Sequence, residues 1–129
     1  MRRAFISLLV SACFLSCQQN ESELAGVYIK IPAVNTKDTL FLYGNKKYKQ
    51  VLYDSSGHYL MTNENKWFVG KHGRIELSDF YLNLDFDTKD YSFSKEAMKI
   101  AVISSSLPLE GNRIIIDEDR DVYYKKLND

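Results

Sequence analysis

The sequence has few of the residues that most often carry chemistry. It contains two cysteines, two histidines and six glycines among 129 residues. Both cysteines, Cys13 and Cys17, lie in the first 17 residues, so the rest of the chain cannot form a disulfide, a thiolate nucleophile or a cysteine metal site. The glycines are scattered, and no glycine-rich loop that could hold a phosphate leads into a helix.

An excess of charge is also absent, because 17 basic side chains balance 17 acidic ones. Residues 1–16 hold two arginines and no acid, so the remaining chain has 15 basic and 17 acidic side chains, a net charge of about −2. Nucleic acid requires a basic face that displaces counterions, so it is not an expected partner. The balance also indicates no polybasic patch for anionic lipids. The remaining length suits one domain with its own core.

The N-terminal segment is the most informative part of the chain. Arg2 and Arg3 precede an apolar run from Ala4 to Leu15, followed by Ser16-Cys17 and polar residues. This order predicts an export signal that is too short to span a bilayer as a mature helix. It resembles the lipobox of bacterial lipoproteins, which implies that the cysteine becomes the first mature residue and carries acyl chains.

Two cysteines compete for that role. Cleavage before Cys13 would leave an apolar core of only about nine residues and would place Phe14 and Leu15 in the mature protein, so we favour Cys17. We expect a signal peptide over residues 1–16, an acylated cysteine with a polar tether over residues 17–24, and a β domain over residues 25–129. The resemblance to lipoproteins implies that the acyl chains make the membrane a partner. It also favours the outer over the inner membrane, because Gln18 is not the aspartate that retains many lipoproteins at the inner membrane. An ordinary secreted protein with an incidental cysteine is the alternative.

Beyond the tether, apolar residues recur with period two, and turn residues return about every eight to twelve positions, which is typical of a sandwich or barrel. A first strand over residues 27–31 should end at Pro32, which cannot donate to a ladder. Turns are expected at Gly44-Asn45, which should supply positive φ values, at Ser56-Gly57, at residues 63–65 and at residues 70–73. Such short connections predict an antiparallel meander.

The parity of the apolar residues reverses once. Ile75 and Leu77 share one face, but Phe80, Leu82 and the alternate residues after them have the opposite parity. A regular strand cannot keep both sets inside, so Ser78-Asp79 must be a bulge, a bend or a break. Such a device curls a sheet, which predicts a barrel or half barrel.

The C-terminal third is expected to complete the sheet. Residues 85–90 suit a solvated loop, residues 94–97 could open a helical turn, and a strand should begin near Met98. Residues 108–112 suit a loop, and residues 113–117 and 122–127 a closing hairpin. The fold class predicted is therefore all-β, an antiparallel up-and-down meander of about eight to ten short strands.

Several short motifs support a family resemblance. They are Gly26-Val27-Tyr28, residues 38–42, Trp67, residues 75–80 and residues 123–126. With these motifs the chain resembles a group of small uncharacterised bacterial lipoproteins with a lipocalin-like β-barrel domain. The resemblance implies a fold and a location in the cell envelope, and it brings no activity with it.

Candidate metal ligands are few. Asp117, Asp119 and Asp121 alternate and could offer oxygen ligands to calcium, but Val122 and Asn128 stand where an EF-hand loop needs glycine and an acid. A solvated hairpin tip explains the same residues better. We therefore expect no metal and no other cofactor.

Candidate catalytic groups are equally sparse. His58 and His72 lie beside turn glycines without metal-binding spacing, and Ser104-Ser105-Ser106 has no marked base and no Gly-x-Ser-x-Gly elbow. No catalytic residue is therefore predicted. Asp38-Thr39-Leu40 could be an O-glycosylation acceptor, although a threonine that opens a strand explains it equally well.

Nine tyrosines, spread over different expected strands, could form a recognition surface, although tyrosine also suits ordinary half-buried strand positions. The leading functional hypothesis is a lipid-anchored, non-enzymatic envelope protein that binds another protein, for example as an inhibitor or immunity protein. A lipocalin-like binder of a small molecule or lipid is the alternative, and a hydrolase is a remote one.

Overall fold

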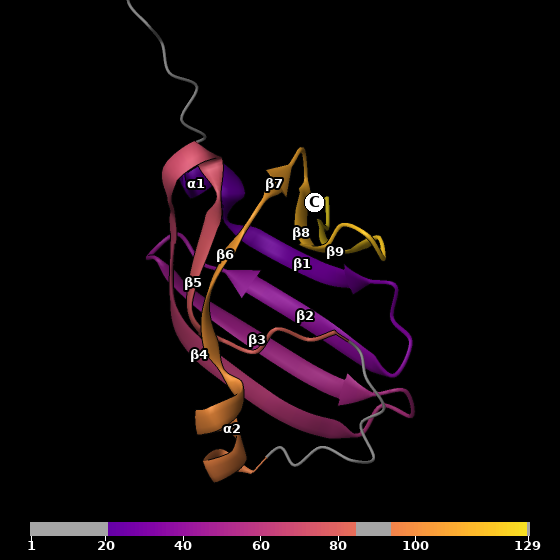
Figure 1. Ribbon diagram of the computed structural model, residues 1–129. Helices are drawn as coiled ribbons and strands as arrows, with labels where there is room; N and C mark the ends of the chain where they lie inside the picture. The colour runs from indigo at the N-terminus through magenta and orange to yellow at the C-terminus, as the bar shows by residue number, and fades with distance from the viewer. Residues whose placement is uncertain (1–20, 85–93, 129) are drawn as a thin grey trace, which may run out of the picture.

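Nine strands within residues 21–84 and 94–128, the part of the chain that the computed structural model describes, form one antiparallel sheet (Figure 1). The elements are α1 (Glu21–Leu24), β1 (Gly26–Ile31), β2 (Thr36–Leu42), β3 (Lys47–Asp54), β4 (Tyr59–Val69), η1 (Lys71–Gly73), β5 (Ile75–Phe80), α2 (Lys95–Ala101), β6 (Ile103–Leu107), β7 (Leu109–Glu110), β8 (Arg113–Asp117) and β9 (Val122–Lys126).

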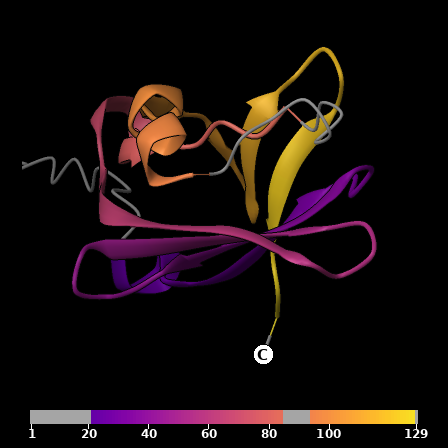
Figure 2. The same cartoon turned by 90° about the horizontal axis from the view of Figure 1, so that it is seen from below.

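The strand order β6-β5-β4-β3-β2-β1-β9-β8-β7 confirms the predicted meander. Strands β1 to β6 pair with their sequence neighbours, and the β8–β9 hairpin adds to the free side of β1. Only Pro108 separates β6 from β7, the two ends of this order, and its carbonyl accepts a hydrogen bond from Ile115 N at 2.9 Å. The sheet is therefore a nearly closed barrel. Figure 2 shows β1–β4 as one wall, with α2 and the β8–β9 hairpin on the same side of it.

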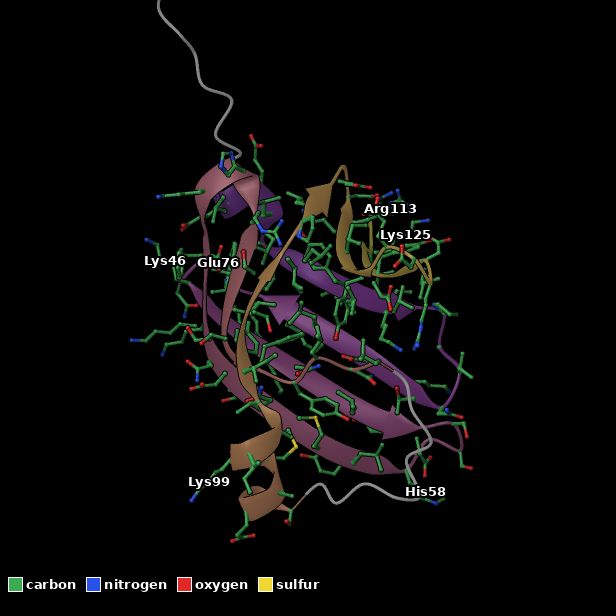
Figure 3. The ribbon with its side chains drawn as sticks, in the orientation of Figure 1. Lys46, His58, Glu76, Lys99, Arg113 and Lys125 are labelled. Atoms are coloured by element: carbon green, nitrogen blue, oxygen red, sulfur yellow. The ribbon has the colours of Figure 1, made fainter. Side chains whose placement is uncertain are left out.

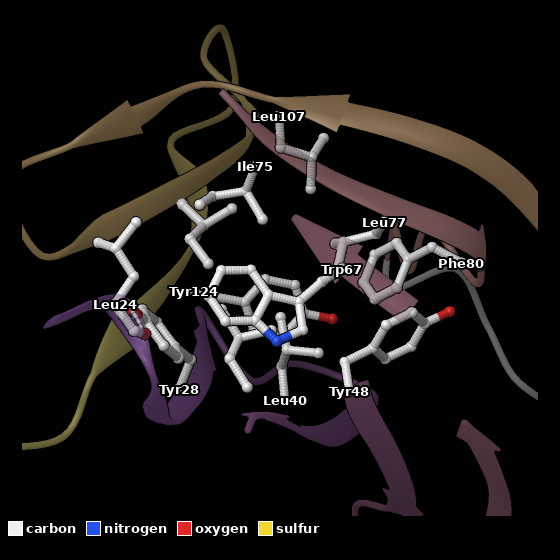
Figure 4. Packing of buried hydrophobic residues seen from close by; sticks show 12 residues of the cluster. Leu24, Tyr28, Leu40, Tyr48, Trp67, Ile75, Leu77, Phe80, Leu107 and Tyr124 are labelled. Carbon is white, nitrogen blue, oxygen red and sulfur yellow. Dashed lines mark hydrogen bonds between the residues drawn. The ribbon is translucent and has the colours of Figure 1, made fainter. Parts of the chain in front are cut away.

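Side chains fill the space that the sheet encloses (Figure 3). The core combines aliphatic residues with aromatic rings, of which Trp67, Tyr28, Tyr48, Tyr124 and Phe80 are the largest (Figure 4). The polar atoms of these rings have partners: the Trp67 indole N–H donates to Tyr43 O at 2.9 Å, and the Tyr48 hydroxyl donates to Ser78 O at 2.6 Å. Burial of the rings therefore leaves none of these polar atoms unsatisfied.

Strand β1 faces the core with the residues that hydrophobicity alone would place outside. Tyr28 and Lys30 are buried, whereas the aliphatic residues that alternate with them are partly exposed. The Tyr28 hydroxyl donates to Leu24 O at 2.6 Å, and the Lys30 ammonium interacts with the buried carboxylate of Asp38. Interior partners decide the orientation of β1, and its apolar side chains line the outside.

The predicted turn at residues 63–65 is wrong, because these residues lie within β4, an unbroken strand of 11 residues. Asn63 Nδ2 donates to Asp79 O at 2.8 Å, and Asn65 Nδ2 donates to Asp79 Oδ2 at 3.3 Å. Acceptor atoms of β5 thus provide hydrogen bonds for the side-chain amides of Asn63 and Asn65, and the two residues can remain in a strand. Residues 59–66 of β4 pair with β3, and residues 67–69 pair with β5.

The predicted irregularity at Ser78-Asp79 is confirmed. The register of β5 against β6 shifts between Leu77 and Phe80, and Asp79 has a φ of 45°. Leu77 and Phe80 are consequently both buried, at 1% and 0% exposure. Beyond Phe80 the backbone leaves the sheet, so the predicted strand does not continue. Leu82 packs against the core, as its parity predicted, but the fully buried residue of this segment is Asn83.

Three other boundaries differ from the predictions. Strand β6 begins at Ile103 and not at Met98, because the Ser94 side chain accepts a hydrogen bond from Ala97 N and starts a helix that extends to Ala101. Residues 109–110, expected in a loop, pair with β8. The turn after β2 has its positive φ at Lys46 (65°) and not at Gly44-Asn45, as in a hairpin whose last loop residue is left-handed. The solvated loop expected at residues 85–90 lies outside the described residues.

Helix α1 covers the end of the predicted tether. Leu24 is buried in the core, and Lys126 Nζ donates to Glu23 O at 2.6 Å. Residues 21–24 are thus packed on the barrel. No helix within residues 21–84 and 94–128 is long and apolar enough to cross a membrane.

The core predicts the effect of truncation. Leu40 is fully buried, so Leu40→Ala should lower the free energy of unfolding by about 2–5 kcal/mol, through lost burial and the cavity that remains. The matched variant Leu127→Ala, at a residue that is 45% exposed, should change it by about 0.5 kcal/mol or less. Urea denaturation followed by Trp67 fluorescence measures both. Equal losses in the two variants would contradict this description of the core.

Candidate functional site

Six polar residues form a cluster inside the barrel, which we call the interior polar cluster. They come from β1, β2, β3, the segment after β5, and β9, and all are at most 3% exposed: Lys30, Thr36, Asp38, Gln50, Asn83 and Tyr124. The alternation of β2 and β3 places Asp38 and Gln50 on the same face as the core leucines. Polar residues at inward positions require partners, and the cluster supplies them.

One carboxylate oxygen is the centre of this cluster. Asp38 Oδ2 accepts a hydrogen bond from the Tyr124 hydroxyl at 2.5 Å, from Asn83 Nδ2 at 3.0 Å and from Gln50 Nε2 at 3.2 Å. Asn83 Nδ2 also reaches Thr36 Oγ1 at 2.9 Å. The last strand and the segment after β5 are thereby fastened to β2.

Burial has the largest effect on the pKa values of the ionisable groups in the cluster. It raises the pKa of Asp38 to about 6, although the donated hydrogen bonds and the charge of Lys30 act in the opposite direction. Burial also raises the pKa of the Tyr124 hydroxyl well above its usual value, and the Asp38 charge adds to this effect. Tyr124 therefore remains a donor to Asp38 at any ordinary pH.

Two acceptor atoms of the cluster, Asp38 Oδ1 and Gln50 Oε1, have no hydrogen-bond partner within the described residues. Within residues 21–84 and 94–128, no three His, Cys, Asp or Glu side chains are grouped to hold a metal ion. The hydrogen bonds of the cluster thus hold β2, β3, β9 and the segment after β5 together.

A second feature is the outer face of the sheet β1–β4, which we call the outer face. Its side chains are those opposite the core: Val27, Ile29, Ile31, Lys37, Thr39, Phe41, Lys47, Lys49, Val51, Tyr53, Tyr59, Thr62, Glu64 and Lys66. Cross-strand pairing places Val27 beside Phe41 and Thr39 beside Val51. The pairs make the apolar residues one continuous surface.

Aromatic rings at both ends of the outer face are ordered by contact with each other. Phe41 stacks on Tyr43 with ring centroids 6.3 Å apart, and Tyr53 meets Tyr59 edge to face at 6.0 Å. Tyr53 and Tyr59 are nevertheless 40% and 60% exposed. Between the two pairs lies a hollow of about 280 Å³, lined by Thr39, Phe41, Lys49, Val51, Tyr53, Tyr59 and Thr62.

The residues considered for chemistry from the sequence do not come together. Asp117 accepts a hydrogen bond from Arg120 N at 3.2 Å and forms an ion pair with that side chain, and it is not grouped with Asp119 and Asp121 around a metal-sized site. His58 contacts Asp54, whose pKa is lowered first by a hydrogen bond from the His58 backbone N–H. His72 lies in η1, at the other end of the barrel from the β3–β4 turn that holds His58.

The serines lie in strand β6, not at its end. The Ser106 hydroxyl donates to Glu76 Oε1 at 2.7 Å and accepts from Arg74 Nε at 2.8 Å, and Ser105 donates to Ile103 O. Asp38 belongs to the interior polar cluster, and Thr39 lies on the outer face. Cys13 and Cys17 lie outside the described residues.

Neither the interior polar cluster nor the outer face was predicted from the sequence. A signal for the first existed, because Asp38 has the parity of Leu40 and Leu42, and Gln50 that of Leu52. A polar residue at an inward position in a strand demands a partner, but the sequence does not say that Asn83 or Tyr124 provides it.

A scan against protein-family models found no match, and neither the curated proteins nor the solved structures contain one that matches this chain.

The interior polar cluster predicts how stability depends on pH. The pKa of Asp38 is about 6 in the folded chain and 3.8 as an ordinary value, so between these pH values the folded state binds more protons than the unfolded state. The contribution of Asp38 to the free energy of unfolding should therefore fall by about 2 kcal/mol as pH rises from 4 to 7.

Asp38→Asn removes this titration, so the difference in stability between variant and wild type should shift in favour of the variant as pH rises. Asp54→Asn is the control, because its effect has the opposite sign. The pKa of Asp54 is lowered in the folded chain, so the stability that Asp54 contributes is present above its ordinary pKa and is lost as pH falls. Urea titrations at pH 4 and pH 7 compare the three proteins. A difference between Asp38→Asn and wild type that is the same at both pH values would refute the prediction.

Proposed function

We propose that this protein is a lipid-anchored, non-enzymatic protein of the bacterial cell envelope, and that its β domain binds another protein through the outer face. The N-terminal order of charge, apolar run, small residue and Cys17 supports the anchor, with Cys13 as the alternative acyl site. Gln18 favours the outer membrane. An inhibitor or immunity protein is the special case of this function that such a location suits.

The observation that carries the proposal is the uncovered apolar surface of the outer face. Its aromatic rings present large contact areas with few rotatable bonds, which keeps the entropic cost of binding low. Contiguous exposed apolar surface of this kind marks interaction sites in soluble domains. The hollow between the ring pairs could receive one apolar side chain of a partner.

Charge identifies the kind of partner. Among the described residues, the outer face carries four lysines and one glutamate: Lys37, Lys47, Lys49, Lys66 and Glu64. Lys47 and Lys66 lie directly opposite one another on paired strands, so their charges repel without a partner. The face thus suits a protein that presents apolar residues flanked by carboxylates, whereas a second copy would bring lysine against lysine.

The anchor predicts the chemistry of the mature N-terminus. Mass spectrometry of the protein from its own membrane should find residues 1–16 removed and Cys17 carrying thioether-linked diacylglycerol. Cys17→Ser should leave the signal segment uncleaved. A mature protein with an unmodified N-terminus would overturn the proposed acyl anchor, and acylation of Cys13 would show that Cys13, not Cys17, is the acylated residue.

The outer face predicts where crosslinks form in intact cells. Benzoylphenylalanine at Tyr53 should give a specific adduct with one envelope protein, whereas the same group at Ile100, which is 86% exposed on α2, should give none. Tyr59→Ala should reduce the adduct about tenfold, as loss of an aromatic anchor does, and Ile103→Ala should leave it unchanged.

Three results would count against the outer face as the binding surface. They are the absence of any adduct at Tyr53, the same adducts from both labelled positions, and an adduct with the mass of two copies of this chain.

A further inference from the structure

The fold separates charges that the sequence mixes. Five segments meet at the end of the barrel that carries α1: α1 itself, the β2–β3 turn, η1 with Arg74, the β7–β8 hairpin, and the end of β9 (Figure 1). Lys46 Nζ lies 3.8 Å from Glu21 Oε2, Lys126 Nζ reaches Glu23 O at 2.6 Å, and Lys126 N donates to Asn112 O at 2.9 Å. We call this the anchor end.

The anchor end has more cations than carboxylates. The cations are Lys46, Lys71, Arg74, Arg113, Lys125 and Lys126, and the carboxylates are Glu21, Glu23, Glu76 and Glu110. Lys47 and Lys66 lie immediately beside it. Figure 3 shows Lys46, Arg113 and Lys125 in its upper half and His58 and Lys99 below them.

The opposite end has the reverse balance. It comprises the start of β2, the β3–β4 turn, α2 and the β8–β9 turn, with six acidic and three basic residues whose side chains the structure describes. These are Asp54, Glu96, Asp117, Glu118, Asp119 and Asp121, and Lys37, Lys99 and Arg120. The domain is therefore an electric dipole along the barrel, although its net charge is near zero.

The proposed anchor fixes which end meets the bilayer. Only four Cα–Cα steps separate Cys17 from Glu21, so a fully extended chain places Glu21 within about 14 Å of the acylated residue. Helix α1 is fixed to the barrel, because the Leu24 side chain is buried and the Leu24 carbonyl accepts a hydrogen bond from the Tyr28 hydroxyl. Lys46 lies 3.8 Å from Glu21, so this cation can come within one to two Debye lengths of the lipid headgroups, where a surface potential still acts.

We infer that the anchor end rests on a bilayer of anionic phospholipid and holds the barrel upright, with its acidic end turned away from the membrane. This inference rests on the proposed function, because the tether brings the end to the lipid. The acyl chains keep the protein on the membrane, and the cations determine how the barrel is oriented on it. An upright barrel leaves the outer face of β1–β4 at its side, open to a protein partner.

The experiment uses mature acylated protein in vesicles of phosphatidylcholine, with and without 30% phosphatidylglycerol. A fluorophore is attached at Asn112→Cys, at the anchor end, or at Ser55→Cys, at the opposite end, and nitroxide-labelled lipid is the quencher. We expect quenching at residue 112 only, in anionic vesicles, and its loss in high salt.

Charge reversal provides the matched comparison. Lys46→Glu with Lys71→Glu should weaken quenching at residue 112 by more than about tenfold, since each basic residue near an anionic surface contributes about fivefold. Lys37→Glu with Lys99→Glu changes the net charge equally, outside the anchor end, and should have no such effect.

The outcomes separate the two proposals. Protein that fails to bind even neutral vesicles would overturn the acyl anchor. Protein that binds both vesicle types, but with quenching equal at the two labels or insensitive to salt and to Lys46 and Lys71, would overturn the orientation alone.

Discussion

The carboxylate of Asp38 is the interaction on which the closure of this barrel depends. It lies on β2, and its donors come from β3, β9 and the segment that follows β5, so one oxygen joins parts of the chain up to 86 residues apart. A buried charge of this kind is costly unless it is paired and hydrogen-bonded, and removal of a single donor would leave it exposed to that cost. The polar interior therefore specifies the arrangement of the strands more than it stabilises them.

Much of the fold could be predicted from the sequence, because period-two alternation and turn residues are local signals. The reversal of parity between Leu77 and Phe80 was enough to locate the bulge, and Ser94 was enough to locate the start of α2. The errors arose where distant partners decide. Asn63 and Asn65 favour a turn by composition, but the carbonyl and carboxylate of Asp79 satisfy them within a strand.

The candidate surfaces were harder to predict for the same reason. Tyr28 and Lys30 face inward because the Tyr28 hydroxyl donates a hydrogen bond to Leu24 O and the Lys30 ammonium is attracted by the Asp38 carboxylate. The aliphatic residues of β1 consequently face outward. No pattern within β1 reveals that choice. Charge shows the same limit: a count of residues indicates no polybasic patch, whereas the topology brings lysines and arginines from four separate segments to one end. Net charge describes the chain, but the field around it depends on the fold.

Pro108 joins β6 to β7 by a single residue, although these strands are the two edges of the sheet. Exposed sheet edges are templates on which other chains can add strands, and proteins avoid polymerisation by covering or closing them. Here one stretch of chain forms both edge strands, because β6 pairs with β5, β7 pairs with β8, and the Pro108 carbonyl between them accepts a hydrogen bond from Ile115 N of β8. Even at high local concentration, molecules of this kind are thereby protected from strand exchange and fibre growth.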